Sequence, residues 1–317
     1  MSPEGNEHLF ATAAIQRRGQ WLLEELAKLK RRPGEESIHD TRVQSRRMRA
    51  ALEAFQDLFP SRPWQDLYDS IRQITRALGE TRETEVMLNL LEELTTAGDV
   101  EGNLCRECLD EKLQKKLKKL KRDLYNHLRQ IELRVLRGRL QHLLGKPKAT
   151  VEYPARGVQS ASGPSAVAAP SDDFDRARSI LCSLAQPILD FQIRFFPRAS
   201  DRKLHKLRIA TKKLRYAMEI FDPAWPGGLK QEIALARSLQ DATGTNQDWA
   251  VLRLYLKREI RKLIAGNKPY LGSQAGRLLA TAEDRKAGLR KAILPALIEL
   301  QKALQLMLVG ATGRSPA

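Results

Sequence analysis

Four side chains that can bind an anion recur at helical spacing in one short stretch of the sequence. They follow one another at steps of three, four and three residues: His39, Arg42, Arg46 and Arg49. Residues at such steps lie on one face of an α-helix, where like charges repel one another. An arginine fork can donate two parallel hydrogen bonds to a phosphate group, and histidine can add a further donor. The spacing therefore indicates either a solvated face or a face that binds a phosphate-like anion.

The same pattern returns in the second half of the chain. Residues 38–55 read IHDTRVQSRRMRAALEAF, and residues 204–221 read LHKLRIATKKLRYAMEIF, so the two stretches align without a gap. The aligned cations of the second stretch are His205, Arg208, Lys212, Lys213 and Arg215, with Arg47 of the first stretch facing Lys213. After a slip of one residue, Arg72 aligns with Arg237. Solvated surface charges have no reason to keep such a register, so the repeat favours binding.

The apolar residues of both stretches lie on a different side of the helix. They are Thr41, Ser45, Met48, Leu52 and Phe55 in the first stretch, and Leu207, Thr211, Leu214, Met218 and Phe221 in the second. At about 100° per residue, this side lies well over 100° from the basic residues. We therefore expect the core to leave the basic residues outside. Glu53 and Glu219, four residues after an arginine, either hold that arginine in place or form ordinary surface ion pairs.

Helical periodicity covers most of the chain, and strand signals are nearly absent. We expect helices over residues 7–31, 38–55, 64–97 (with a break at Gly79), 103–143, 174–196, 201–221, 227–260 and 270–308. Residues 145–173 are rich in Gly, Pro, Ala and Ser, which is typical of a flexible linker. The predicted fold class is all-α, with one helical bundle in residues 1–144 and a second in residues 174–317.

The formal net charge of +17 predicts attraction to polyanions such as nucleic acid, an anionic membrane surface or polyphosphate. We call the aligned cations the basic stripes: His39, Arg42, Arg46 and Arg49 in the first half, and His205, Arg208, Lys212 and Arg215 in the second. Aromatic residues make up only 6% of the chain and none lies in these stripes, which argues against stacking on single-stranded nucleic acid. No uninterrupted apolar run is long enough to span a bilayer, and the N-terminus lacks a signal-peptide pattern. We expect a cytoplasmic protein that does not insert into a membrane.

Other kinds of chemistry have weaker signals. Cys105 and Cys108 form a C-x-x-C that has no second ligand pair, which disfavours a redox or zinc site. His39 and His205 are accompanied by cations, which would weaken a metal site, so we expect no metal, no cofactor and no catalytic residue. The densest basic run is residues 111–122, EKLQKKLKKLKR. It is either a solvated helix face or an extension of an anion path through Lys112, Lys115, Lys119 and Arg122.

The pattern His-x-x-Arg-x-x-x-[Arg/Lys]-[Arg/Lys]-x-Arg, once in each half, resembles the CHAD family, the "conserved histidine α-helical domain". LGETRETEVML at 78–88 and LQDATGTNQDWAVL at 239–252 resemble that family's next helix, although Thr243 replaces Leu78 and Gln247 replaces Arg82. The resemblance implies two four-helix bundles related by a pseudo-twofold repeat, with a basic surface or pore between them that binds inorganic polyphosphate.

Carried onto this chain, the implied polyphosphate-binding residues are His39, Arg42, Arg46, Arg47, Arg49, Arg72, His205, Arg208, Lys212, Lys213, Arg215 and Arg237. Some members of the family are fused to a triphosphate-tunnel enzyme with an E-x-E-x-K signature, which this sequence lacks. The resemblance therefore implies a stand-alone, non-catalytic binding module, which could gather at polyphosphate granules. A nucleic-acid-binding helical protein is the alternative, motivated by the net charge alone.

Overall fold

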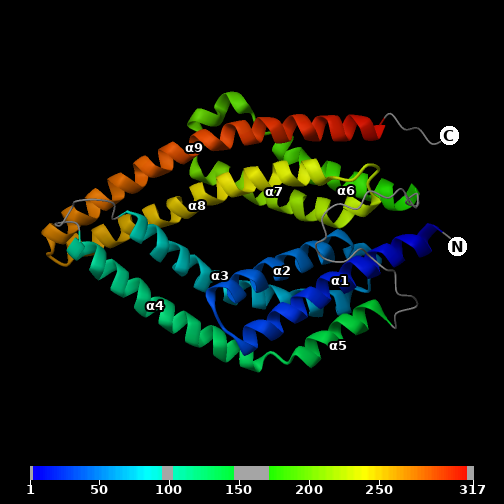
Figure 1. The fold of residues 1–317 in the computed structure, drawn as a ribbon, viewed down its shortest axis with the longest axis horizontal. Helices are drawn as coiled ribbons and strands as arrows, with labels where there is room; N and C mark the ends of the chain where they lie inside the picture. Colours follow the sequence, from blue (N-terminus) through cyan, green and yellow to red (C-terminus); the bar gives the residue numbers. More distant parts are fainter. Residues whose placement is uncertain (1–2, 95–102, 146–170, 313–317) are drawn as a thin grey trace. The chain divides into compact units, whose positions relative to one another are not determined.

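The computed structural model describes residues 3–94, 103–145 and 171–312. These residues form nine α-helices and no strand, which confirms the predicted all-α class (Figure 1). The helices are α1 (Pro3–Arg31), α2 (Glu35–Ala54), α3 (Ser61–Glu93), α4 (Asn103–Gln130), α5 (Leu133–Leu144), α6 (Ser171–Leu189), α7 (Asp201–Phe221), α8 (Lys230–Ala265) and α9 (Pro269–Thr312). Most of the predicted linker, residues 146–170, lies outside the described residues, and residues 171–173 already belong to α6.

Several predicted helix boundaries are wrong. Helix α6 ends at Leu189 instead of residue 196, and a short 3₁₀ helix, η3 (Ile193–Arg198), follows it. Helix α3 continues through Gly79, because an isolated glycine costs helix stability without forcing a break. The single helix expected over residues 103–143 is divided, since α4 ends at Gln130 and α5 begins at Leu133. Within this break the Ile131 carbonyl accepts a hydrogen bond from Nζ of Lys30, at 2.7 Å. That bond comes from α1, a hundred residues away in the chain, so helical periodicity gave no sign of it.

The chain forms two compact units, neither of which is one continuous stretch. Unit 1 comprises Met1–Thr75, Arg129–Ser183 and Tyr216–Ile233. Unit 2 comprises Arg76–Leu128, Leu184–Arg215 and Ala234–Ala317. Helix α7 therefore belongs to unit 2 up to Arg215 and to unit 1 from Tyr216 onward. The division into bundles at residues 1–144 and 174–317, and their pseudo-twofold relation, stay predictions.

The core of unit 1 includes the two phenylalanines that end the repeated stretches. The rings of Phe55 and Phe221 meet edge to face, with their centroids 5.5 Å apart. Phe10 of α1 contacts both rings, at 6.0 Å in each case. Phe55 and Phe221 are fully buried. The ends of α2 and α7 are thus held together by the residues that the sequence repeat keeps in register.

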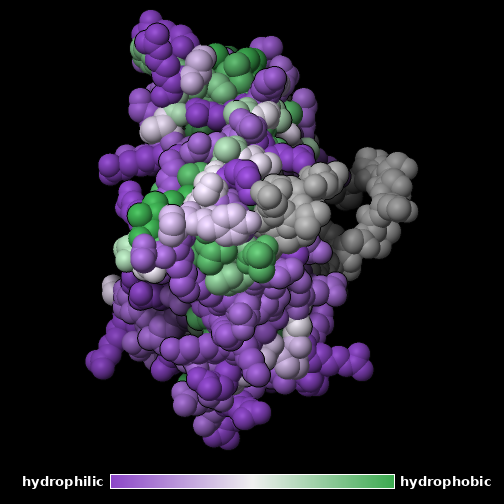
Figure 2. Space-filling model, turned by 90° about the vertical axis from the view of Figure 1, so that its left-hand side faces the viewer, coloured by the Kyte–Doolittle hydropathy of each residue, from purple (hydrophilic) through white to green (hydrophobic). Residues whose placement is uncertain are grey.

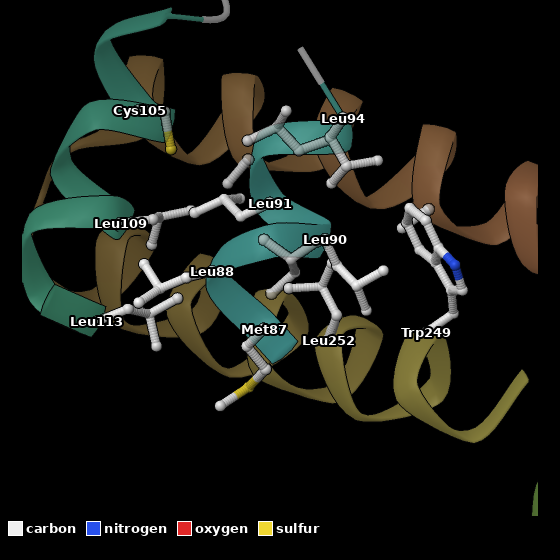
Figure 3. Close-up of a cluster of buried hydrophobic side chains, with 14 of the residues drawn as sticks. Met87, Leu88, Leu90, Leu91, Leu94, Cys105, Leu109, Leu113, Trp249 and Leu252 are labelled. Atoms are coloured by element: carbon white, nitrogen blue, oxygen red, sulfur yellow. The ribbon is translucent and has the colours of Figure 1, made fainter. Parts of the chain in front are cut away.

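Leucine side chains from four helices, α3, α4, α8 and α9, build a core cluster of unit 2. Figure 3 shows Leu88 and Leu91 of α3 pointing toward Leu109 and Leu113 of α4, with Leu252 of α8 nearby. The sulfur of Cys105 also lies in this cluster. Burial, and then the neighbouring Cys108, raise the pKa of the Cys105 thiol, so the thiol stays protonated at neutral pH. Cys105 contributes to unit 2 as a small core residue.

Helix α9 is the most apolar helix of unit 2. Its segment Pro269–Val309 is long and apolar enough to cross a membrane, with a mean hydropathy of 1.5 over an 18-residue window. The core helix of a protein that does not span a membrane passes the same test. In α9, 33% of that window is buried, and Ile293, Leu297, Leu300 and Leu304 are buried at helical spacing. Figure 2 shows one face of the molecule, on which hydrophilic residues dominate and the hydrophobic residues form small, separate patches.

Candidate anion-binding site

Helices α2 and α7 both bury the apolar side that the sequence predicted. All ten predicted residues are at most 2% exposed: Thr41, Ser45, Met48, Leu52, Phe55, Leu207, Thr211, Leu214, Met218 and Phe221. Side-chain direction in a helix follows from sequence position. Because the apolar side packs into the cores, the direction in which the basic stripes point is determined as well. His39 is exposed, whereas Arg42, Arg46 and Arg49 are half-buried. These four residues lie together on α2 in unit 1.

Arg49 is held by a tyrosine and a glutamate. Its Nη2 donates a hydrogen bond to the Tyr68 hydroxyl at 2.7 Å and forms an ion pair with Glu53 at 3.4 Å. The Tyr68 hydroxyl donates in turn to Glu53 Oε1 at 2.6 Å. Burial and the bond to Glu53 raise the pKa of Tyr68, so the phenol keeps its proton. The pair expected between Glu53 and Arg49 is confirmed, and it orients the last arginine of the stripe.

Glu219, the counterpart of Glu53, binds arginines of other helices. Its Oε2 lies 2.9 Å from Nε of Arg47 and 3.8 Å from Nη2 of Arg18. All three residues belong to unit 1. Arg47 follows Arg46 directly, so it lies about 100° around the helix from the stripe. The structure therefore gives Arg47 a stabilising contact between α2 and α7, while its role in binding stays a prediction.

The second stripe lies entirely in unit 2, as does Arg237 of α8. His205, Arg208 and Lys212 are half-buried, and Lys213 is exposed. Arg215 differs from this pattern, because it is only 5% exposed and its Nε donates to Gln240 Oε1 at 3.0 Å. The expectation that the core leaves the basic residues outside is wrong at this position. A buried guanidinium needs hydrogen-bond acceptors, and Gln240 supplies one.

Arg208 and His205 carry buried polar atoms that make no hydrogen bond within the described residues. These atoms are Nε of Arg208 and Nδ1 of His205. A buried polar atom without a hydrogen-bond partner is costly, and an ordered water molecule or a bound anion can satisfy it. The arrangement in unit 2 therefore suits an anion with several oxygen atoms.

Gly244 of α8 is a site residue to which sequence reasoning gave no role. A Cβ at this position would lie 3.6 Å from Nε and 3.9 Å from Nη2 of Arg208, so the guanidinium rests against this helix. Gly79, which aligns with Gly244, would place its Cβ more than 4 Å from any atom of another element. The recurrence of a glycine in both halves was the available signal, but it did not reveal that only the second one gives room to an arginine.

The remaining predicted cations are placed as follows. Arg72 belongs to unit 1 and Arg237 to unit 2, and both are exposed. Nη1 of Arg72 lies 3.9 Å from Asp69 Oδ1, a weak surface pair. Within the described residues, no group of three or more His, Cys, Asp or Glu side chains could hold a metal ion.

Acidic residues pair with much of the basic run on α4. Nζ of Lys112 lies 3.2 Å from buried Glu259, and Lys115 pairs with Glu111 at 2.6 Å. Arg122 pairs with Asp123 at 3.5 Å. Burial opposes the charge on Glu259, but hydrogen bonds from Lys262 and Lys112 outweigh it and lower its pKa. Lys112 therefore neutralises a buried carboxylate of unit 2, which favours the structural interpretation of this run.

Comparison with known proteins identifies a matching family model and two similar structures. The family model described as CHAD domain matches residues 13–257. The crystal structure of the CHAD domain from the plant Ricinus communis is similar to this chain, with 21% identity, a TM-score of 0.61 and coverage of 92% of this chain and 91% of that one. PptA from Streptomyces chartreusis is similar with 16% identity and a TM-score of 0.62, over 90% and 97% of the two chains. No curated protein matches the sequence.

Proposed function

The chain belongs to the CHAD domain family, and we propose that it is a non-catalytic module that binds inorganic polyphosphate through its basic stripes. The observation that carries this proposal is the stripe on α7, where Arg208 and His205 hold buried polar atoms without a hydrogen-bond partner in the described part of the chain. Successive phosphates of a polyphosphate chain offer many charged acceptors, which suit residues spaced one helical turn apart. The matching register on α2 supports a second row of contacts.

Nucleic acid is the second candidate ligand, and it is favoured by the net charge of +17. Polyphosphate carries no bases, so it needs no aromatic platform, whereas binders of single strands stack bases on aromatic rings. We propose that polyphosphate is preferred, for that reason and because the CHAD resemblance implies this ligand.

A competition experiment tests this preference. Labelled long polyphosphate is bound to the full chain, and unlabelled polyphosphate, duplex DNA or RNA is added at equal phosphate concentration. We expect unlabelled polyphosphate to displace the label and the nucleic acids to displace much less of it. Equal displacement by DNA or RNA would contradict the proposal. Incubation with polyphosphate and Mg²⁺ should release no phosphate, and release would show an enzyme instead.

Gly244→Leu should weaken polyphosphate binding by about tenfold, equivalent to about 1.4 kcal/mol. The leucine side chain would occupy the space in which the Arg208 guanidinium rests against α8. Binding is measured by titration at fixed salt, on protein whose thermal melt shows that it is folded. Gly79→Leu is the matched control, because its side chain would project into open space. Equal effects of the two substitutions, or none at Gly244, would show that Gly244 does not position Arg208.

A further inference from the structure

An exposed patch of unit 2 combines apolar and basic side chains. It covers the short 3₁₀ helix η3 (Ile193–Arg198) and the first two turns of α7. Ile193 is 37% exposed and Phe195 is 52% exposed, and both are next to exposed cations. The exposed cations around them are Arg194, Arg198, Arg202, Lys203 and Lys206. We call these seven residues the η3 patch.

Acidic residues do not neutralise the η3 patch. None of its five cations forms an ion pair with another residue of the described part of the chain. The nearby carboxylate of Asp201 binds Arg253 and Lys286 instead of the patch cations. Asp190 accepts a hydrogen bond from Gln186 at 2.7 Å. The patch therefore presents a local excess of positive charge, which is complementary to an anionic surface.

A hollow of about 460 Å³ lies beside these residues. Apolar side chains line most of it, among them Phe191, Phe195 and Leu207, and Lys203 and Lys206 line it as well. Such a hollow suits a ligand that has an apolar part next to an anionic group. Polyphosphate has no apolar part, so the polyphosphate proposal does not explain this feature.

The η3 patch is also absent from the repeated pattern. Lys206 follows His205 directly, so it lies about 100° around α7 from the basic stripe. In the first half of the chain the aligned position holds Asp40, and Arg202 aligns with Glu36. The sign of the charge is thus reversed at these two positions, whereas the histidine and two of the arginines of the stripe are identical in both halves. The positive charges at residues 202 and 206 therefore belong to the second half alone and are not part of the repeated stripes.

We propose that the η3 patch docks the protein on the surface of an anionic phospholipid bilayer. Ile193 and Phe195 enter the boundary between headgroups and acyl chains, and the five cations contact the headgroup phosphates. An aliphatic residue such as Ile193 offers no ring for a nucleobase, and the Arg194 guanidinium lies 4.8 Å from the Phe195 ring centroid and covers part of that ring. These observations favour lipid over nucleic acid.

Vesicle sedimentation with the full chain tests the docking. The probes are vesicles of phosphatidylcholine alone and vesicles that also contain phosphatidylglycerol, at physiological salt. We expect binding to the phosphatidylglycerol vesicles and little to the neutral ones. Ile193→Ser with Phe195→Ser should weaken this binding by about tenfold or more, because two apolar side chains no longer leave water. Lys203→Glu with Lys206→Glu should abolish the preference for phosphatidylglycerol.

Two matched variants separate the patch from general properties of the surface. Leu254→Ser with Leu306→Ser removes two apolar residues that are at least as exposed, on α8 and α9, and should bind vesicles as the unchanged protein does. Arg285→Glu with Lys291→Glu reverses two exposed charges on α9 and should keep the preference. If the controls lose binding as the patch variants do, or the patch variants keep it, the docking proposal is overturned.

The polyphosphate titration keeps the two proposals distinguishable. The Ile193→Ser and Phe195→Ser variant should bind polyphosphate with unchanged affinity, since the stripe on α7 is intact. Loss of binding to duplex DNA or to an acidic peptide by this variant, with vesicle binding unchanged, would assign the patch to that other partner and overturn the lipid assignment.

Discussion

Replacing Arg42 and Arg208 together by alanine should weaken polyphosphate binding by at least about a hundredfold at fixed salt. Each substitution removes a hydrogen bond between a charged donor and a charged acceptor, worth roughly 1.5–3 kcal/mol, and 1.4 kcal/mol is about tenfold in affinity. The two arginines are aligned in the repeat and lie on α2 and α7, so the double variant weakens both stripes. Titration of labelled polyphosphate into the folded variant measures the loss.

Salt dependence gives a second measurement on the same double variant. Every phosphate contact releases counterions, so the slope of log affinity against log salt should become shallower by roughly one to two for two lost contacts. Arg285→Ala with Lys291→Ala removes the same charge from the exposed side of α9 and serves as the control. Unchanged affinity and slope in a folded Arg42→Ala and Arg208→Ala protein would place the binding site elsewhere.

Phe221→Ala should cause a large loss of stability, about 3–5 kcal/mol in the free energy of unfolding. Phe221 is fully buried against Phe55 and Phe10, so the substitution removes apolar burial and leaves a cavity. Denaturant unfolding of the full chain measures the change.

The control for this substitution is Leu306→Ala on α9. Leu306 is 75% exposed, so its replacement should change the free energy of unfolding by no more than about 0.5 kcal/mol. Phe55→Ala should be about as costly as Phe221→Ala. The double variant should lose less free energy of unfolding than the sum of the two single variants, because either single substitution already removes the contact between the two rings. A mild effect of Phe221→Ala would mean that the repeated phenylalanines are not central to the core of unit 1.

The ten residues predicted for the buried faces of α2 and α7 are all buried, although α7 buries Arg215 as well. Periodicity determines which side chains share a face, and the burial of apolar surface is the main driving force of folding, so Met48, Leu52, Leu214 and Met218 lie where the pattern placed them. The all-α class follows from the same periodicity over the whole chain. The CHAD resemblance was available from short motifs because these motifs occur twice in the same register.

Contacts between distant residues were not predictable in this way. The division between α4 and α5 has no glycine or proline at residues 129–134, and the Lys30 bond to Ile131 depends on where α1 lies. Glu219 was expected either to hold Arg215 or to form an ordinary surface ion pair, and its carboxylate also pairs with Arg47 and Arg18, which reach it from other helices of unit 1. Local spacing indicates which pairs can meet, whereas packing decides which pairs do.

Helix α7 is shared by the two compact units, so the proposed binding of polyphosphate would also affect folding. His205 and Arg208 belong to unit 2, while the last turn of the same helix, which carries Phe221, belongs to unit 1. A polyanion bound at the first part of α7 adds its binding free energy to the cost of unravelling the helix, about 2.7 kcal/mol when free ligand exceeds its dissociation constant a hundredfold. Unfolding of unit 1 that also unravels the whole of α7 would be opposed by the same free energy. The resistance of this protein to heat and proteolysis would then rise with the concentration of polyphosphate.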